Sequence, residues 1–321
     1  MTDTLPLVSI ITPAYNRASY LDETIQSVLE QHYLRIEYIV LDDGSTDNTS
    51  EVLHKYSGQI IWESHPNMGE HRTVNRGFSM AHGEIVAVVN SDDPLRPGAV
   101  STAVSFMQAH PDVIVGYPDW DFIGPNSEVI GHVQVPEYDY LRMVRRHQPP
   151  VGPGAFVRRR AIQSAGVRDP GLRYVGDYDF WLRLGLHGKF ARIPGTLATY
   201  RAHPDAATVS QRGDLMADEH VRVMEKFYSL PDLPREVRKV RAESFSWAHA
   251  AAAMTACKPT SLVSLKHLMK AFLYHPWSLP DKLAIGLPLV IPIPVLKLLP
   301  RRIAAQAAKR KGQLSSDLTW R

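Results

Sequence analysis

The sequence predicts an α/β fold, in which a mostly parallel sheet is flanked by helices and followed by a helical C-terminal extension. Three observations favour this fold. Short apolar runs alternate with amphipathic stretches over the first hundred residues, polar turns follow several of these runs, and the chain beyond Gln211 shows mostly helical periodicity. With 44% hydrophobic and 21% charged residues in a chain of 321, the composition allows a sizeable core.

The first hundred residues contain four predicted strands. Residues 7–12 form a compact, β-branched run that ends at Pro13, and apolar residues at three- and four-residue spacing predict a helix from Tyr20 to Leu29. The elements that follow are strands at 36–41, 59–62 and 84–89 and helices at 46–56 and 69–81. This alternation predicts parallel strands with helices on both faces of the sheet.

The rest of the chain is less regular at first and then helical. We expect short strands at 113–117 and 129–134, a helix at 175–186, and two short strands within 190–200 that are broken at Pro194 and Gly195. Helices are predicted at 215–228, 234–257 and 261–273. No internal repeat is visible.

The charge and cysteine content narrow the setting. The single Cys257 has no intramolecular partner for a disulfide, and no Cys/His cluster at zinc-finger spacing accompanies it, which favours a reducing, cytoplasmic environment. Residues 1–6 lack the basic and apolar regions of a secretory signal. The net charge of +3 is too small to indicate nucleic-acid binding.

The excess of positive over negative charge is concentrated at the C-terminal end. Residues 282–316 contain seven basic and no acidic residues, and within them residues 283–296 are uncharged. This run is shorter than the roughly 20 residues that span a bilayer, and three prolines interrupt it. Two interpretations remain open: an interfacial segment that meets anionic lipid at the inner face of the cytoplasmic membrane, or a proline-rich strap on the core followed by a solvated tail.

Polar residues follow three of the predicted strands. They are residues 13–16, the pair Asp42 and Asp43, and the turn from Asn90 to Asp93. Ligands of such sheets bind beyond the carboxyl ends of the strands, so these residues should converge on one crevice. The oxygens of residues 90–93 suit Mg²⁺ or Mn²⁺. The same residue types are also common in turns and helix caps that bind no metal.

Five motifs in sequence resemble the family 2 glycosyltransferases. They are residues 8–17, 39–47, 67–69, 83–93 (Gly83-Glu84-Ile85 ahead of Asn90-Ser91-Asp92-Asp93) and 175–183, and the resemblance covers roughly residues 5 to 205. Chance agreement of five ordered motifs is far less probable than agreement of one. The resemblance implies the Rossmann-like GT-A fold and inverting sugar transfer from a nucleotide diphosphate-sugar, with UDP-sugar as the expected donor.

The resemblance also implies the donor and metal residues. Pro13 and Tyr15 should line the nucleobase pocket, with Asp42 hydrogen-bonded to the base or ribose. The remaining donor-binding candidates are Asn16, Asp43, Asn75, Arg76, Asn90, Ser91 and Asp92. A divalent cation, Mn²⁺ or Mg²⁺, is expected on Asp92, Asp93 and His203, although Asn90 replaces the first acidic residue of the family's Asp-X-Asp motif.

The acceptor side depends on residues near 177. Inverting transfer needs a carboxylate to take the proton of the acceptor hydroxyl, and by resemblance Asp177 has this role, with Asp179 as the other candidate. Capping of the following helix is the structural alternative for Asp177. The acceptor residues expected by analogy are Trp120, Asp121, Gly154 and Asp179.

Together these features predict an inverting glycosyltransferase in cell-surface polysaccharide or lipid-linked glycan synthesis. Its parts are a nucleotide-sugar binding and catalytic domain at 1–208, a helical extension at 209–275, and a proline-rich apolar segment with a basic tail at 276–321. A dehydrogenase or nucleotidyltransferase would need a glycine-rich phosphate loop after the first strand, which is absent from residues 12–16. The alternative is a non-catalytic nucleotide-sugar binding protein of the same fold.

Overall fold

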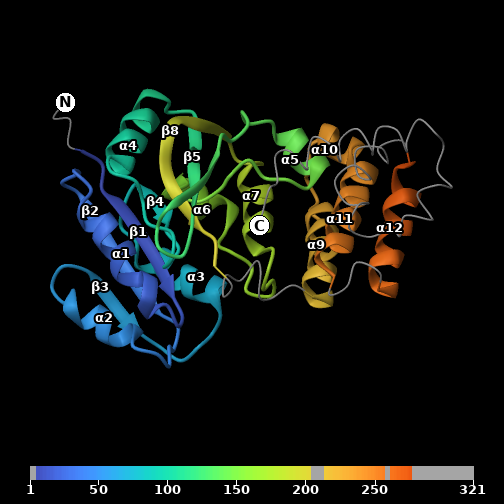
Figure 1. The fold of residues 1–321 in the computed structure, drawn as a ribbon. Coiled ribbons are helices and arrows are strands. Elements are labelled where there is room, and N and C mark those ends of the chain that lie inside the picture. The colour runs from blue at the N-terminus through green and yellow to red at the C-terminus, as the bar shows by residue number, and fades with distance from the viewer. Residues whose placement is uncertain (1–4, 204–212, 257–260, 277–321) are drawn as a thin grey trace. The chain divides into compact units, whose positions relative to one another are not determined.

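The computed structural model describes residues 5–203, 213–256 and 261–276 (Figure 1). The predicted apolar segment at 283–296, the basic residues after it and Cys257 lie outside the described residues. The chain divides into two compact units, of residues 1–140 with 149–209 and residues 141–148 with 210–321. We expected residues 141–148 in the first domain, at 1–208, whereas the structure groups them with the second unit.

The first unit is built on one sheet, eight-stranded in the part of the chain that is described, with the order β3-β2-β1-β4-β7-β5-β6 and β8 paired to β5. Four strands run parallel: β1 (Val8–Ala14), β2 (Ile36–Asp42), β3 (Ile61–Ser64) and β4 (Ile85–Val88). The others are β5 (Val113–Ile123), β6 (Val129–Val133), β7 (Phe156–Arg158) and β8 (Lys189–Arg201). Because β7 runs antiparallel to both β4 and β5, the sheet is mixed beyond β4.

Helices flank this sheet, which confirms the predicted α/β fold (Figure 1). They are α1 (Ala18–Leu29), α2 (Thr49–Lys55), α3 (Glu70–Met80), α4 (Ala99–Ala109), α6 (Arg159–Ala165) and α7 (Gly176–Leu184). In α1 the buried Leu21, Ile25 and Val28 recur at the spacing of one helix face. In α3 a Cβ atom at Gly77 would collide with the Ile11 side chain, so only glycine lets this helix approach β1 so closely.

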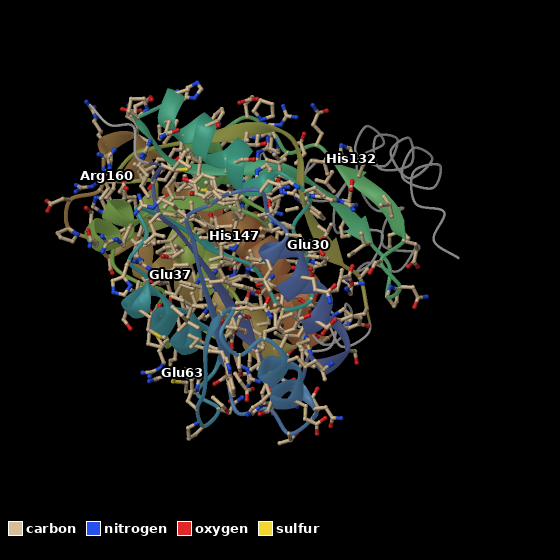
Figure 2. All side chains as sticks on the ribbon, turned by 90° about the vertical axis from the view of Figure 1, so that its left-hand side faces the viewer. Glu30, Glu37, Glu63, His132, His147 and Arg160 are labelled. Atoms are coloured by element: carbon tan, nitrogen blue, oxygen red, sulfur yellow. The ribbon has the colours of Figure 1, made fainter. Side chains whose placement is uncertain are left out.

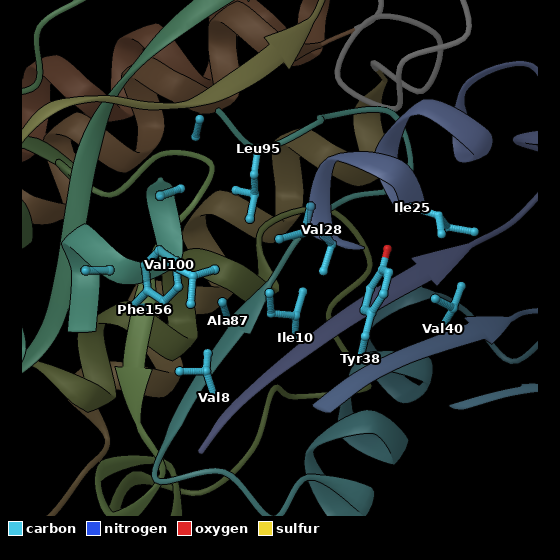
Figure 3. Packing of buried hydrophobic residues seen from close by; sticks show 14 of the residues in the cluster. Val8, Ile10, Ile25, Val28, Tyr38, Val40, Ala87, Leu95, Val100 and Phe156 are labelled. Carbon is cyan, nitrogen blue, oxygen red and sulfur yellow. The ribbon is translucent and has the colours of Figure 1, made fainter. Parts of the chain in front are cut away.

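The main core lies between the sheet and helices α1 and α4. Figure 3 shows Ile10 of β1 and Val40 of β2 among the cluster that includes Val28 of α1 and Val100 of α4. All four side chains are fully buried. Each buried aliphatic side chain of this size contributes about 1.5 to 3 kcal/mol, so the central strands are firmly held and their ends have fixed positions.

Several sequence expectations were wrong in detail. The helices α4, α5 (Tyr140–Arg146) and α6 and the strand β7 were not expected. The segment 190–200 forms one strand, β8, because Pro118 pairs with Ile193 and Asp119 with Thr196, leaving two residues as a bulge at Gly195 with φ 104°. The helix expected at 234–257 is divided at Val240 into α10 (Arg235–Lys239) and α11 (Arg241–Thr255).

The second unit is helical in its described residues. Besides α10 and α11 it contains most of α5 (Tyr140–Arg146), with α9 (Asp214–Tyr228) and α12 (Leu262–Tyr274), and α11 packs on both α9 and α12. Two pairs of histidine rings lie within hydrogen-bond distance inside it: His147 with His220 and His249 with His267, both at 2.9 Å. Among the described helices none is long and apolar enough to cross a membrane.

Candidate active site

The polar residues predicted to converge do follow neighbouring strands at one edge of the sheet. β1 lies between β2 and β4 and is parallel to both, so the three strands end at the same edge (Figure 1). Residues 15–17 follow β1, Asp42 is the last residue of β2, and Asn90–Asp93 come shortly after β4. We call this group of residues the strand-end site.

Asn16 joins two of these loops. Its backbone has φ 52°, a left-handed conformation that asparagine tolerates better than most residues. Its backbone N–H donates to Ser45 Oγ at 2.9 Å, and its side-chain Oδ1 accepts from the Thr46 backbone N–H at 2.8 Å. The preceding Tyr15 is 46% exposed, whereas Pro13 is buried within β1. A flat ring is therefore available to a ligand at Tyr15, whereas Pro13 is not exposed to one.

The two carboxylates after β2 hold loops in place. Asp42 Oδ1 accepts from the Ser45 nitrogen at 2.9 Å, and Oδ2 accepts from Ser64 Oγ at 2.7 Å. Asp43 accepts from the nitrogens of Met68 and Gly69 at 2.7 and 3.0 Å, immediately before α3 begins. Both aspartates are almost fully buried. They thus shape the loops around the site.

Asp92 is paired with an arginine and lies within hydrogen-bond distance of a histidine. Its Oδ2 atom lies 3.1 Å from Arg17 Nε and 3.0 Å from His203 Nε2. The Asp92 side chain is 16% exposed, so it is reachable from solvent. Arg17 follows β1 and His203 follows β8, so these contacts join residues that are far apart in the sequence.

Asp93 has a different environment from its neighbour. It is 5% exposed, its Oδ1 accepts from the Arg201 nitrogen at 2.8 Å, and its Oδ2 accepts from Asn90 Nδ2 at 2.8 Å. Burial, and then the charge of Asp92, raise the pKa of the Asp93 carboxyl above its ordinary value. Asn90 closes the turn by donating a hydrogen bond that an ionised aspartate at this position would lack. Ser91 is buried, and its carbonyl accepts from Thr24.

Arg201 supports this turn from behind, a role that the sequence did not reveal. Its guanidinium is fully buried and donates to the Asp92 carbonyl at 2.9 Å. It also donates to Glu23 Oε2 at 2.6 Å and to Ser127 Oγ at 2.9 Å, and its remaining partners are the carbonyls of Gly124 and Pro125. These partners lie far apart in the chain, so no local pattern marks Arg201 as a positioning residue.

The structure gives the predicted donor residues of α3 other partners. The Asn75 amide exchanges two hydrogen bonds with the backbone of Arg168, at 2.7 and 2.9 Å. Arg76 is exposed and forms a two-pronged ion pair with Glu63 of β3, which Figure 2 labels. Neither arrangement supports a direct role in donor binding.

Asp177 lies in the first turn of α7 and is exposed. Its Oδ1 accepts from the Tyr178 nitrogen at 2.7 Å. The preceding Gly176 packs against the His71 ring of α3, where an added Cβ would lie 2.5 Å from Nε2. Since Asp43 holds the residues just before α3, this packing connects the start of α7 to the strand-end site.

The other predicted acceptor residues are mostly engaged within the protein. Asp179 is 1% exposed and pairs with Arg183 at 2.8 Å, an arrangement that does not support acceptor binding. Asp121 is paired with Arg96 at 2.5 Å and with His132, labelled in Figure 2, at 2.9 Å. Arg96 and His132 thus occupy both Asp121 oxygens.

Trp120 and Gly154 border the glycine-rich loop before β7. Trp120 is half-buried, with its ring 4.6 Å from that of Phe122, and it packs against Gly152, where a Cβ would lie 2.5 Å from the indole nitrogen. Gly154 has φ 73° and packs against Ala198. The exposed part of Trp120 remains the one aromatic surface among the predicted acceptor residues.

Comparison with known families identifies this arrangement. Residues 9–164 match the model of glycosyl transferase family 2, and this stretch includes Tyr15, Asp42 and Asp92 of the strand-end site. The matched part of the chain belongs to that family. The predicted family and fold are therefore confirmed, while the individual residue roles remain predictions.

Relatives that this chain resembles include an uncharacterized glycosyltransferase of Rickettsia typhi, 30% identical over 56% of the chain and 58% of that protein. The hyaluronan synthase of Pasteurella multocida is 28% identical over 65% of the chain, but only 22% of the synthase is covered. The chain thus spans little more than half the length of the first relative and less than a quarter of the second.

Solved structures with the same fold include Staphylococcus aureus TarS, residues 1–349, in complex with UDP-GlcNAc. The TM-score is 0.64 at 18% identity, with 95% of this chain and 87% of that one covered. The Pyrobaculum calidifontis mannosyltransferase PcManGT, in complex with GDP-Man and Mn²⁺, gives a TM-score of 0.59 at 17% identity, with 98% and 88% covered. At these identities the likeness shows the shared GT-A fold.

A divalent cation fits part of the residue set that the family resemblance suggested. The Asp92 carboxylate and the His203 imidazole converge on each other, and both are suitable ligands for Mn²⁺. Asp93 does not fit, because both of its oxygens accept structural hydrogen bonds and the side chain is buried. No cluster of three metal-binding side chains occurs among the described residues, so the donor diphosphate would have to supply further oxygens.

Proposed function

We propose that this family 2 chain is an inverting glycosyltransferase that transfers a sugar from a nucleotide diphosphate-sugar, in particular a UDP-sugar, to an acceptor hydroxyl. The single observation that carries the proposal is the strand-end site, where an exposed Tyr15 and a partly exposed Asp92 follow adjacent parallel strands. A nucleotide diphosphate has an aromatic base that can stack on Tyr15 and a negatively charged diphosphate that Asp92 can bind through a divalent cation, with Arg17 beside it. The likeness to a UDP-GlcNAc-bound structure supports the donor class.

The donor would be held along the strand ends. Its base would stack on the exposed Tyr15 ring, and Asp42, which is 2% exposed and accepts hydrogen bonds from Ser45 and Ser64, would hold the loop beside the base. Its diphosphate would lie near Asp92, where Arg17 supplies positive charge. A divalent cation on Asp92 and His203 would neutralise the negative charge that grows on the leaving diphosphate.

The transfer step would use Asp177 as general base. Its exposed carboxylate would take the proton of the acceptor hydroxyl as that oxygen attacks the anomeric carbon. The new bond forms between the acceptor oxygen and the sugar, the bond to the diphosphate breaks, and the electron pair leaves with the diphosphate. Attack opposite the leaving group inverts the anomeric configuration. Asp179 is not available for this step because Arg183 pairs with it inside the protein.

We further propose a growing cell-surface polysaccharide or lipid-linked glycan as the acceptor class. The relationship to a hyaluronan synthase supports a saccharide acceptor. The half-buried Trp120, bordered by Gly152, offers a surface on which a sugar ring can pack.

Donor turnover tests the proposal directly. The protein is incubated with a panel of UDP-sugars, Mn²⁺ and saccharide acceptors, and released UDP is measured beside donor affinity by calorimetry. UDP release with at least one donor is expected. The variant Arg76→Gln should release UDP like the wild type, because Arg76 pairs with Glu63. Donor binding without release across the acceptor panel would instead favour a non-catalytic nucleotide-sugar binding protein. Failure to bind any UDP-sugar would refute the donor class.

A further inference from the structure

Helix α12 turns its large apolar side chains outward. Leu262, Leu265, Met269, Phe272 and Leu273 are 85, 42, 66, 47 and 74% exposed. At 100° per residue these five side chains fall within an arc of about 100° on the helix surface. We call this arc the outer face of α12. Scattered single exposed apolar residues are ordinary, but a continuous stripe on one helix face marks an interaction surface.

The face of α12 that packs against α11 is small and polar. Its buried residues are Ser264, His267 and Ala271. Ser264 Oγ donates to the Ala253 carbonyl at 2.9 Å, and His267 lies 2.9 Å from His249. A helix that only completes a protein core buries its large apolar residues, whereas α12 does the reverse. The outer face therefore requires an explanation other than packing on α11.

On α12 itself, the charges beside the outer face are positive. Lys266 and Lys270 are exposed and lie next to the apolar arc on the same side of the helix. No residue of α12 is acidic. In the sequence, residues 244–316 contain ten basic residues and a single acidic one, Asp281. The outer face thus lies within a long stretch of one charge sign.

We propose that the outer face of α12 binds an anionic membrane surface. A helix of 13 residues is about 20 Å long, so it would lie in the interfacial plane with Leu262, Met269 and Leu273 toward the acyl chains. Lys266 and Lys270 would reach the phosphate groups of anionic lipids. A second copy of the chain fits this surface less well, because α12 packed on α12 gathers lysines of like charge without acidic partners.

Vesicle flotation of the full-length chain tests this proposal, and it does not depend on transferase activity. We expect the protein to float with vesicles of phosphatidylcholine and phosphatidylglycerol but not with phosphatidylcholine alone. The variant Met269→Gln/Leu273→Gln should lose at least about tenfold in the partition constant. The matched control is Leu215→Gln, since Leu215 is 71% exposed on α9 of the same unit, and it should float like the wild type.

A second pair of variants tests the charges. Lys266→Gln/Lys270→Gln should lower the partition constant about tenfold or more, and Lys55→Gln/Lys239→Gln, which removes two other exposed lysines, should not. The proposal is overturned if the wild type does not float, if it floats equally with neutral vesicles, or if the α12 variants float like the wild type. A dimer by light scattering that the Met269/Leu273 variant converts to monomer, with unchanged flotation, would assign the face to a second copy.

Discussion

Replacement of Arg201 by lysine tests how the Asp92 turn is held. The buried guanidinium donates five hydrogen bonds, to Glu23, Ser127 and the carbonyls of residues 92, 124 and 125. A lysine amine has three donors, so at least two of the five acceptors lose their partner. Each lost bond from a charged group to a buried oxygen costs about 1.5 to 3 kcal/mol, so we expect a loss of roughly 3 to 6 kcal/mol in the free energy of unfolding.

The effect on donor binding separates a positioning role from a purely structural one. Arg201 Nε donates to the Asp92 carbonyl at 2.9 Å, so loss of this hydrogen bond should let the turn at residues 90–93 move and weaken UDP binding. The affinity for UDP is measured by calorimetry at a temperature at which the variant is folded. Arg158→Lys is the matched control. Its guanidinium likewise donates to three backbone carbonyls, those of Val113, Met107 and His110, none of which belongs to the strand-end site. Arg158→Lys should lose stability but keep UDP affinity.

Urea denaturation followed by circular dichroism gives the stability of both variants. If Arg201→Lys and Arg158→Lys weaken UDP binding equally, the effect is general loosening of the sheet. If Arg201→Lys costs less than 1 kcal/mol and leaves UDP affinity unchanged, the reasoning from buried donors to the Asp92 turn is wrong.

Three further predictions concern the carboxylates and the buried histidines. Asp177→Asn should keep donor affinity but lower turnover by about 10² to 10⁴-fold, as for loss of a general base, and near-normal turnover in a UDP-release assay would remove Asp177 from that role. Asp92→Ala should abolish any dependence of UDP affinity on Mn²⁺ in calorimetry, whereas a dependence that persists would place the cation elsewhere. Burial lowers the pKa of His220 and His249 to about 4, below the ordinary value of 6.5. The unfolded chain therefore binds more protons between pH 6.5 and 4, and the free energy of unfolding should fall as the pH drops through this window, by up to about 1.4 kcal/mol per pH unit for each histidine. Urea midpoints at pH 7, 5.5 and 4.5 check this, and His220→Gln/His249→Gln should flatten the pH profile.

The strand ends were readable from the sequence because their signals are local. An apolar run that stops at a polar turn marks both a buried strand and its carboxyl end, as at Asp42 and at Asn90. The helix α4 was missed although its buried residues recur on one helix face: Ala99, Val100, Ala103, Val104 and Met107. That face consists mainly of alanine and valine, and Ser101, Thr102 and Ser105 lie outside it, so large apolar side chains do not mark the helical spacing as they do in α1.

The partners of side chains were not readable, because they come from distant segments. Arg201 and Glu23 are 178 residues apart, and Asn75 and Arg168 are 93 apart. We predicted from the sequence that Arg76 faces the donor. In the structure β3 pairs with β2, and Glu63 of β3 forms an ion pair with Arg76. Such contacts depend on sheet order, and no local pattern in a single sequence specifies that order.

The paired acidic residues illustrate why a motif alone does not assign roles. In the pair of Asp92 and Asp93, the second carboxylate is buried and bonded to Asn90 and Arg201, and the first remains open to solvent. The helix α7 repeats this division: Asp179 is buried against Arg183, and Asp177 is exposed. A buried carboxylate needs partners that offset its desolvation, and the partners that stabilise it also occupy its oxygens. The carboxylates left for chemistry are thus the ones that the fold does not use to hold its own loops.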